Sequence, residues 1–394
     1  MPPIEESVPK PYLLVTGDFV KTGGMDHCNH ALATFLAERG TETHLVAYRV
    51  DDELARHRNI TFHRVPKPLN SYFLANPLLD RFGRAAARKL ARRSGRVVVN
   101  GGNCIWPDVN WIIHLHTRFR PAVVASPLRR LKAAIDFRQA ALAERRALAC
   151  AKVIIAGSRS TREELINDFG IPEARVHLVD LGIDAEKFRI PTETERSTAR
   201  EKLGLADETI GVAFVGGLGD RRKGFDTLYS AWRTLCAAPA WRAKLVVVGA
   251  GVELTAWIAR ARADGLADRI SFLGFNSRQD FVVEVLRGCD VMVAPTRYEG
   301  YGLAIKEAVC TGLPTIVTRT TPIAEQMVGA FDEIMISDPE SAEEVANRLR
   351  ICFSRLSNLR HEAALLSTRL RRWRWKDMAA KIVEIIESCG TGDL

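Results

Sequence analysis

The stretch "DVMVAPTRYEGYGLAIKEAVCTGLPTIVT", Asp290–Thr318, contains a complete strand–turn–helix–strand pattern. Its first run, "DVMVAPT", and its last, "LPTIVT", are predicted strands, and "LAIKEAVCTG" between them is a predicted helix that ends at Gly312. A strand that feeds a helix and then another strand is typical of a parallel sheet covered by helices. The stretch therefore predicts an α/β fold.

Two glutamates of this stretch, Glu299 and Glu307, stand eight residues apart around the turn "RYEGYG". The turn leads to Gly302 and Leu303 at the helix start, where backbone N–H groups without internal partners favour a phosphate or diphosphate. The carboxylate of Glu307, about one turn into the helix, can accept two hydrogen bonds from a vicinal diol such as a ribose. Glu299 could do the same for a second sugar. The alternative, a helix cap and a solvent-facing glutamate, would be favoured if this motif stood alone.

The same alternation recurs along the 394 residues, which is too long a chain for one typical core. The strand candidates of the first half are "YLLVTG", "THLVAYRV", "ITFHRV", "RVVVNG", "NWIIHLH", "KVIIAGS" and "RVHLVD". Those of the second half are "TIGVAFVGG", "KLVVVGAG", "RISFLG", "DVMVAPT", "LPTIVT" and "EIMISD". The polar, proline-containing segment 185–202 between them is predicted to be a linker. We therefore predict two doubly wound, Rossmann-like domains facing a cleft, with ligands beyond the carboxyl ends of the strands.

A second glycine turn, in "VAFVGGLGDRRKGFDTLYSAW", combines Gly216 and Gly217 with the cations Arg222 and Lys223. Such a turn can grip a diphosphate and neutralise the charge that builds as it leaves. A basic surface loop without a ligand is an equal alternative for this turn taken alone.

The first half contains a third glycine turn and a histidine that could face the same ligand. Gly23 and Gly24 precede a helical pattern, and His116 ends the predicted strand "NWIIHLH". A histidine at a strand end is more often a packed structural residue, but this position makes a substrate contact plausible. His114, two residues earlier, is predicted to lie in the core.

Composition indicates an ordinary soluble protein, with 47% hydrophobic and 26% charged residues. No apolar run approaches the length of a membrane-spanning helix, and the acidic start does not resemble a secretory signal. The eight cysteines are scattered without a C-x-x-C pair, which favours small core residues in a reducing cytoplasm over a zinc site. These features predict a cytoplasmic protein that contains no metal.

The net charge of +9 is concentrated between Arg81 and Arg146, where 15 lysines and arginines face 3 acidic residues. Apolar residues at near-helical spacing indicate a basic helix in this region: Leu128, Leu131, Ile135 and Leu142. Such a helix is either a solvated face packed on its domain or a surface that meets an anionic lipid leaflet or acceptor. No nucleic-acid-binding motif is present, so we expect no nucleic-acid partner.

The chain resembles the retaining GT-B glycosyltransferases of family four. The pair Glu299 and Glu307 resembles the E-x7-E signature of that family, and "FVGGLGDRRKG" resembles its strand-and-lysine motif. "FLGFN", "LHT", "AGSRSTREEL" and "VDLGIDAEKF" also match segments of the family, as does "RWRWKDMAAKIVEII" near the end of the chain. The resemblance covers most of the chain and is strongest from 210 to 320.

The resemblance implies a domain organisation and a site. It places an acceptor domain at 1–188, a nucleotide-sugar donor domain at 189–370, and a helix at 371–394 that crosses back to the first domain. The implied catalytic residues are Lys223, Arg222, His116 and Glu299. The implied donor-binding residues are Gly23, Gly24, Gly216, Gly217, Phe275, Glu299, Gly300, Tyr301, Gly302, Leu303 and Glu307.

The implied activity is that of a hexosyltransferase-like enzyme that moves a sugar from a UDP- or GDP-sugar to a hydroxyl of a saccharide or lipid-linked acceptor. Neither a metal nor another cofactor is expected, because the sequence lacks a D-x-D triplet and cations can stabilise the leaving diphosphate. The basic region 81–146 suggests a peripheral contact with an anionic membrane.

One residue departs from the family pattern. The family usually has an arginine at the position of Gly217, and here Arg222, directly before Lys223, is predicted to replace it. Three other functions remain open from the sequence: a glycosidase that uses the two glutamates, a sugar-nucleotide epimerase, and a sugar-nucleotide-binding protein without turnover.

Overall fold

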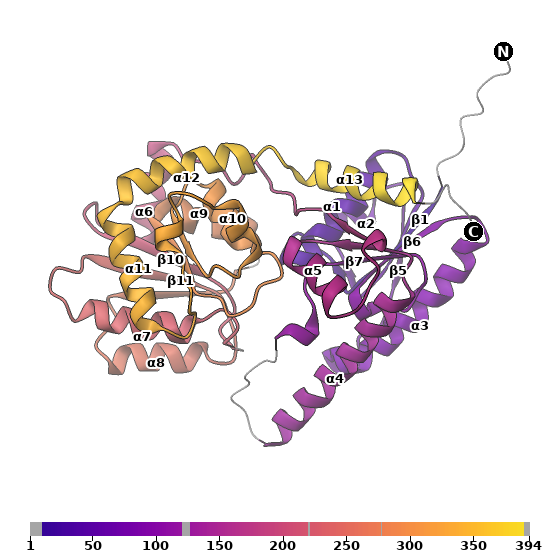
Figure 1. Ribbon diagram of the computed structural model, residues 1–394, viewed down its shortest axis with the longest axis horizontal. Coiled ribbons are helices and arrows are strands. Elements are labelled where there is room, and N and C mark those ends of the chain that lie inside the picture. Colours follow the sequence, from indigo (N-terminus) through magenta and orange to yellow (C-terminus); the bar gives the residue numbers. More distant parts are fainter. Residues whose placement is uncertain (1–9, 120–126, 220, 277, 390–394) are drawn as a thin grey trace, which may run out of the picture. The chain divides into compact units, whose positions relative to one another are not determined.

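The computed structural model of the protein describes residues 10–119, 127–219, 221–276 and 278–389, with the side chains of these ranges except 127–133 and 279 (Figure 1). The described residues form two compact units. Unit 1 contains those within Met1–Thr117, Leu131–Gly182 and Trp375–Leu394, and unit 2 those within Arg118–Arg130 and Ile183–Arg374.

Unit 1 is built on a parallel sheet of seven strands in the order β5-β3-β1-β6-β7-β8-β9. The strands are β1 (Tyr12–Val15), β3 (Thr43–Ala47), β5 (Ile60–Arg64), β6 (Arg96–Asn100), β7 (Val109–Ile112), β8 (Val153–Ala156) and β9 (Val176–Leu178). A short parallel pair accompanies them, β2 (Asp18–Phe19) with β4 (Arg49–Val50). The strand order reverses direction between β1 and β6, and in such sheets this switch point is where ligands bind.

The helices of unit 1 are α1 (Gly24–Glu38), α2 (Asp52–Ala55), α3 (Tyr72–Ala91), α4 (Pro127–Cys150), α5 (Arg159–Asn167) and α13 (Trp375–Ser388). Helix α3 covers one face of the sheet, where Leu79 and Leu90 pack in a buried cluster with Leu13 and Val99. Helix α13, from the end of the chain, packs against α1 from its beginning (Figure 1).

Unit 2 contains a parallel sheet of five strands in the order β12-β11-β10-β13-β14. The strands are β10 (Ile210–Val215), β11 (Ala243–Val248), β12 (Ile270–Gly274), β13 (Val291–Ala294) and β14 (Thr315–Val317). The helices are α6 (Glu193–Leu203), α7 (Phe225–Cys236), α8 (Leu254–Ala263), α9 (Gln279–Gly288), α10 (Leu303–Cys310), α11 (Ala342–Ser354) and α12 (Leu356–Leu370). The switch point of this sheet lies between β10 and β13. The predicted α/β class with parallel sheets is thus confirmed.

The predicted linker 185–202 is wrong for most of its length, because α6 occupies Glu193–Leu203. Thr192 and Glu195 form a reciprocal capping box at the start of this helix. The helix is polar, yet it is held to unit 2 because Arg196 and Arg200 both pair with the buried Asp290. The segment is therefore polar because its arginines form ion pairs with Asp290 in the same unit, and not because it is a linker.

Two predicted strands also differ from the structure. The strand "NWIIHLH" ends at Ile112, so both histidines lie beyond it, and His114 is exposed rather than part of the core. The run "EIMISD" forms only one bridge, between Thr318 and Ile336, because Asp332–Ile334 turn into a short 3-10 helix.

Among the described residues, no helix combines the length and the apolar composition needed to cross a bilayer.

Candidate functional site

The candidate site of unit 2 consists of the two loops that follow β10 and β13, on either side of the switch point. Gly224, which precedes α7, has a φ of +70°, and a Cβ there would lie 1.9 Å from the carbonyl oxygen of Pro295. The backbone of Arg297 donates to the carbonyl of Arg222 over 2.9 Å. Only glycine allows this close approach, so the two loops are joined backbone to backbone.

Glu299 is the centre of this cluster. Its side chain is 14% exposed, and its two oxygens meet different cations. Lys223 Nζ donates to Oε2, and Arg222 Nη1 lies 3.5 Å from Oε1 and 3.2 Å from the carbonyl oxygen of Tyr298. Burial alone would raise the pKa of this carboxyl, but Lys223, Arg222 and the Gly300 amide outweigh burial and hold the pKa below its usual range. Glu299 is therefore an ionised carboxylate that holds two cations beside α10.

The two arginines before Lys223 point to different partners. Arg221, with a φ of +57°, places its Nε 4.0 Å from Glu253, whereas Arg222 lies beside Glu299. A Cβ on Gly216 would come within 2.9 Å of the Lys223 side chain. The predicted pair Arg222 and Lys223 is thus brought together with Glu299, and Arg221 is not part of that group.

Helix α10 presents a backbone N-terminus at the same turn. Its N-cap, Gly302, has a φ of +97° and offers no side-chain cap, so the first amides of the helix are left to other acceptors. Tyr301 is buried, so its side chain is not offered to a ligand, while Leu303 is partly exposed. Phe275, which follows β12, is 67% exposed.

Glu307 lies on α10 and differs sharply from Glu299. Its carboxylate makes no hydrogen bond with any residue that the structure describes. Burial raises its pKa to about 8, and the charge of Lys187 only partly opposes this. The two glutamates of the motif are therefore in opposite electrostatic states, one fixed as an anion and the other favoured as the neutral acid.

The glycine turn "VVVGAGVEL", residues 246–254, has a structural role. A Cβ on Gly249 would lie 1.8 Å from the carbonyl oxygen of Gly216, and one on Gly251 would lie 2.1 Å from that of Leu218. These glycines therefore let the loop after β11 support the loop that carries Lys223. Gly217 has nothing closer than the carbonyl oxygen of Ala250 at 3.9 Å, so this position is open.

In unit 1, His116 begins a short 3-10 helix, η3 (His116–Arg118), that follows β7. Its Nδ1 lies 2.7 Å from Oε2 of Glu144, and its backbone N–H donates to Oε1 of Glu144 over 3.1 Å. The Glu144 carboxylate is 0% exposed and the imidazole 46% exposed. The hydrogen bond to Glu144 raises the pKa of His116, and burial opposes this without cancelling it.

The other predicted residues of unit 1, Gly23 and Gly24, form the start of α1. Gly23 is the N-cap, with a φ of +86° and no side-chain cap, and Gly24 is the first helical residue. Their turn follows the short strand β2, which comes after β1, the strand beside the switch point of the first sheet.

Two family descriptions match the chain in sequence. "Glycosyltransferase Family 4" matches residues 22–187, and "Glycosyl transferases group 1" matches residues 209–354. The first contains His116 and Glu144, and the second contains Lys223, Glu299 and Glu307. The chain belongs to the family 4 glycosyltransferases.

Solved structures show that this family 4 member has the GT-B fold. WaaG, a glycosyltransferase involved in lipopolysaccharide biosynthesis, superposes with a TM-score of 0.73 at 18% identity, over 97% of this chain and 100% of WaaG. Anabaena HepE in complex with UDP and glucose superposes with a TM-score of 0.69 at 17% identity, over 96% of this chain and 100% of HepE.

The curated relatives match a smaller part of this chain than the solved structures do. Mannosylfructose-phosphate synthase of Agrobacterium fabrum is 25% identical over 60% of this chain and 52% of its own length. The lipopolysaccharide core biosynthesis mannosyltransferase LpsB of Rhizobium meliloti is 29% identical over 57% of this chain and 62% of its own length. The chain spans about half the length of the first curated relatives that it matches.

Glu144 is the residue of this family 4 member that sequence reasoning missed. It was counted only as one of three acids in the basic region 81–146. The available signal is that Glu144 is an acid among basic neighbours on a predicted helix. Charged residues are rarely buried without a partner, so a buried position would imply one. Its partner lies 28 residues away, so spacing alone could not reveal the contact.

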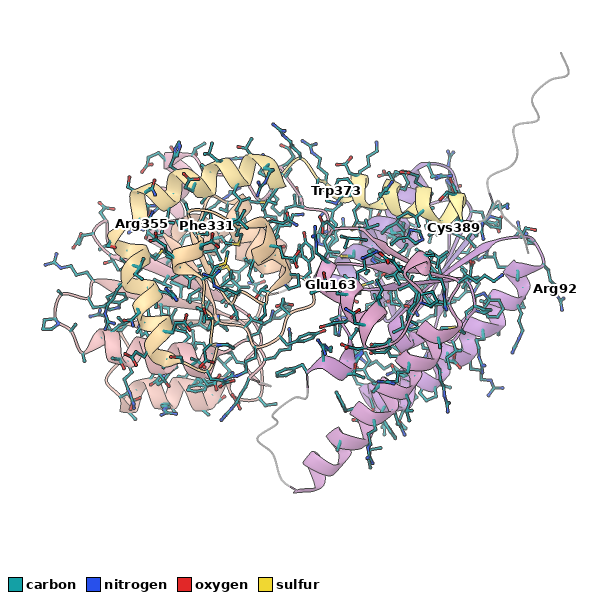
Figure 2. The ribbon with its side chains drawn as sticks, in the orientation of Figure 1. Arg92, Glu163, Phe331, Arg355, Trp373 and Cys389 are labelled. Atoms are coloured by element: carbon teal, nitrogen blue, oxygen red, sulfur yellow. The ribbon has the colours of Figure 1, made fainter. Side chains whose placement is uncertain are left out.

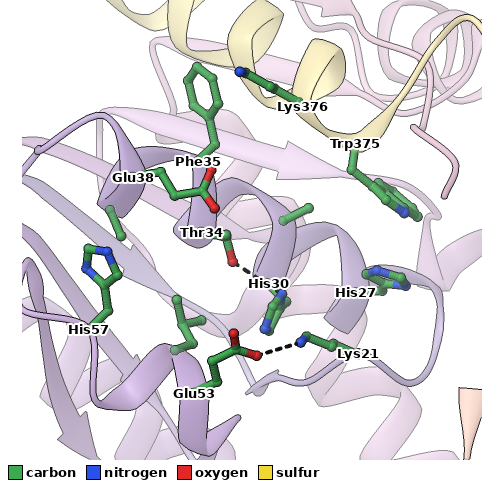
Figure 3. A pocket seen from close by; sticks show the side chains of 13 residues that line it. Lys21, His27, His30, Thr34, Phe35, Glu38, Glu53, His57, Trp375 and Lys376 are labelled. Carbon is green, nitrogen blue, oxygen red and sulfur yellow. Dashed lines mark hydrogen bonds and ion pairs between the residues drawn. The ribbon is translucent and has the colours of Figure 1, made fainter. Parts of the chain in front are cut away.

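A separate cavity of about 340 Å³ lies in unit 1 between α1, α2 and the start of α13 (Figure 3). Its lining includes His30, Trp375 and the ion pair between Lys21 and Glu53, whose atoms are 3.1 Å apart. None of the predicted site residues lines it.

Proposed function

We propose that the protein transfers a sugar from a nucleotide diphosphate sugar to a hydroxyl acceptor, with retention of configuration and without a metal. The observation that carries this proposal is the joining of Lys223, Arg222 and Glu299 at the N-terminus of α10. A diphosphate placed there meets two cations and the start of a helix that has no side-chain cap. Membership of the family adds that a glycosyl group is what is transferred, so the nucleoside diphosphate is the leaving group.

The cluster of Lys223, Arg222 and the start of α10 is suited to stabilise the negative charge of the leaving group. Departure of a nucleoside diphosphate adds negative charge to the leaving oxygen, and preorganised cations and amides stabilise that charge. Lys223 and Arg222 are already held in place by Glu299, so little reorganisation is needed when the diphosphate binds. Glu299, sharing its cations with the diphosphate, remains an anion that can accept hydrogen bonds from hydroxyls of the donor sugar.

Glu307 has a different role in the proposal. An ionised carboxylate offers both oxygens as acceptors to the two hydroxyls of the ribose, whereas in the neutral acid one oxygen carries a proton and donates. Because the pKa of Glu307 is about 8 in the protein alone, binding of the ribose should release a proton below that pH. His116 is proposed to contact the sugar nucleotide as well, through Nε2, the ring nitrogen that does not face Glu144.

The donor is proposed to be a UDP- or GDP-sugar, and the acceptor a saccharide or a lipid-linked saccharide. The complex of HepE with UDP and glucose supports a uridine nucleotide, and the names of WaaG and LpsB support lipopolysaccharide or a related glycan. Binding of UDP-, GDP-, ADP- and dTDP-sugars, measured by thermal shift and then by calorimetry, tests the donor. Stabilisation by none of the four would refute the donor site.

Turnover must then be separated from binding. With the stabilising sugar nucleotide, release of the nucleoside diphosphate is measured against a panel of saccharide and glycolipid acceptors, with EDTA present and absent. NMR of the product reports whether the anomeric configuration is retained. An epimer formed from the donor alone, or tight binding without turnover across the panel, would favour the epimerase or binding-protein alternative.

A peripheral contact with an anionic membrane is proposed for helix α3. Part of the basic region 81–146 lies outside the described residues, but α3 lies within them and exposes Arg81, Arg88, Lys89 and Arg92. Arg92 extends outward at the end of the helix (Figure 2). Apolar side chains are exposed at and before the other end of α3: Leu69, Tyr72, Phe73 and Leu74. A basic face with an apolar tip suits a bilayer surface of anionic lipids.

Vesicle sedimentation tests this contact. The protein should bind phosphatidylglycerol-containing vesicles more than phosphatidylcholine vesicles, and salt should weaken binding. The double variant Arg81→Glu with Arg88→Glu should lose roughly tenfold or more in affinity, at about 1 kcal/mol per basic residue. Arg56→Glu with Arg58→Glu, on another exposed part of unit 1, makes the same charge change and serves as the control. Equal losses in both variants would refute a specific role of α3.

A further inference from the structure

A buried carboxylate needs a partner, and the partner of Glu144 is one residue in unit 1. The carboxylate is 0% exposed, and both of its oxygens are used by His116: Oε1 accepts from the backbone N–H and Oε2 contacts ring Nδ1. Removing an ion from water costs several kcal/mol unless hydrogen bonds replace the solvent. Because one residue supplies both hydrogen bonds, Glu144 holds the turn that starts η3 as well as the ring.

The place of Glu144 is itself determined by close backbone packing. The short 3-10 helix η2 (Gly101–Asn103) follows β6, the strand at the switch point of the sheet. A Cβ on Gly102 would lie 2.8 Å from the backbone nitrogen of Glu144 and 3.1 Å from the carbonyl carbon of Ala143. Helix α4 therefore packs directly on η2, and this contact sets the depth at which the carboxylate lies.

The hydrogen bond to Glu144 determines which proton the imidazole carries. A carboxylate only accepts, so Nδ1 must be the protonated nitrogen in the neutral ring. Nε2 makes no hydrogen bond with any described residue, on a ring that is about half exposed. In the imidazolium Nε2 donates a hydrogen bond; in the neutral ring held by Glu144 it can only accept one.

We propose that Glu144 is a positioning residue, which fixes the tautomer and the direction of His116 so that its Nε2 meets an oxygen of the sugar nucleotide. The inference rests on the proposed function for the role of His116 and goes beyond it in assigning Glu144. Buried carboxylates that orient a functional histidine are a recurrent device in enzymes. Within the described residues, the ring of His114 is a second titratable group beside His116, with the two ring centroids 5.0 Å apart.

The consequence is a pH dependence that a packing role would not produce. Because the carboxylate favours the imidazolium, donation by Nε2–H persists above the usual range of a histidine and is lost as pH rises through the raised pKa. In Glu144→Gln the amide oxygen can still accept from Nδ1–H, but the negative charge is gone. His116 should then lose its proton at lower pH, by about 1 unit.

The experiment compares Glu144→Gln with Glu163→Gln, which changes an exposed glutamate on α5 of the same unit. Histidine-ring NMR of the full chain, with His116 assigned by His116→Gln, gives the pKa of His116 without any substrate. The pH dependence of kcat/KM gives the alkaline limb with the donor. Glu144→Asp, which keeps the charge, provides a second variant if the amide destabilises the fold.

The expected result is a fall of about 1 unit in the NMR pKa and the same shift of the alkaline limb in Glu144→Gln, with neither change in Glu163→Gln and partial recovery in Glu144→Asp. An unchanged NMR pKa of His116 would overturn the proposal. A lowered NMR pKa with an unchanged pH–rate profile would overturn it as well, because His116 would then be held but not used. Failure of the proposed function has a different signature, since no sugar nucleotide would bind or turn over while the NMR titration still gives its answer.

Discussion

Glu299 in unit 2, 14% exposed, and Glu144 in unit 1, 0% exposed, are glutamates that hold cationic partners near the switch point of a parallel sheet. Glu299 is held by an ammonium and a guanidinium, those of Lys223 and Arg222. Glu144 holds an imidazole, that of His116, whose charge changes with pH. The comparison shows that the partner decides whether such an ion pair depends on pH, because a histidine titrates near physiological pH.

The largest expected effect comes from removing the ammonium of Lys223. Lys223→Ala should lower kcat by about 10² to 10³, because a preorganised charge on the leaving group is worth that much in other enzymes. The variant also leaves Glu299 with less compensation, so its folding is checked by thermal melting. Lys202→Ala, which removes an exposed lysine of the same unit paired with Glu284, is the control and should retain normal turnover. Steady-state kinetics with the identified donor decides between them.

A smaller effect should distinguish the two arginines of the same loop. Arg222→Ala should lose about 10- to 100-fold in kcat/KM, since one charge-assisted contact is removed while Lys223 remains. Arg221→Ala should change turnover less than about threefold, because Arg221 is exposed and its contact with Glu253 is long, at 4.0 Å. The reverse order would show that Arg221 takes the place of the arginine missing at Gly217.

The backbone contact that sets the depth of Glu144 gives a stability prediction for unit 1. Gly102→Ala should destabilise the protein by about 1–3 kcal/mol, because its Cβ would overlap the backbone of α4. Gly24→Ala has nothing within 4 Å of the added Cβ and should be close to neutral in the same denaturant titration. Equal destabilisation by both substitutions would mean that the contact between η2 and α4 is not rigid.

The smallest expected effect concerns Glu307, the glutamate without a cation bound to it. Its folded pKa of about 8 lies above the unfolded value of 4.5, so the stability it contributes is present below pH 4.5 and lost as pH rises through 8. The side chain of Glu307 is partly exposed. We therefore expect the pH-dependent loss of folding stability to be roughly 1–2 kcal/mol, which is less than the full pKa shift would give.

Thermal unfolding at pH 5 and pH 8.5 measures this difference. Glu307→Gln should melt higher relative to the wild type at pH 8.5 than at pH 5, by a few degrees. The same variant should bind the nucleoside diphosphate more weakly, because an amide accepts fewer hydrogen bonds from the ribose. A constant difference in melting temperature between the two pH values would show that Glu307 is already ionised.

Local patterns predicted much of the cluster of Lys223, Arg222 and Glu299 in unit 2. The turn "RYEGYG" and the turn before Lys223 each lie between a strand and a helix, so their place at the carboxyl ends of β13 and β10 follows from the pattern. The pairing of Lys223 with Glu299 did not follow, because the two residues are 76 positions apart and meet only when β10 and β13 become neighbours. The polar sequence with a proline predicts a linker where α6 lies, although Thr192 and Glu195 have the spacing of a capping box, which indicates a helix start.

By itself, the sequence determined the α/β class, the parallel strands and the residue types that could hold a diphosphate, because hydrophobic periodicity and glycine turns act over a few residues. Only the tertiary structure decided the electrostatic states. It placed Glu299 against two cations, left Glu307 with only the partial compensation of Lys187, and buried the carboxylate of Glu144 against His116. The physical reason is that the pKa of a carboxyl depends on desolvation and on charges within a few ångströms, and these distances arise from strand order rather than from spacing along the chain.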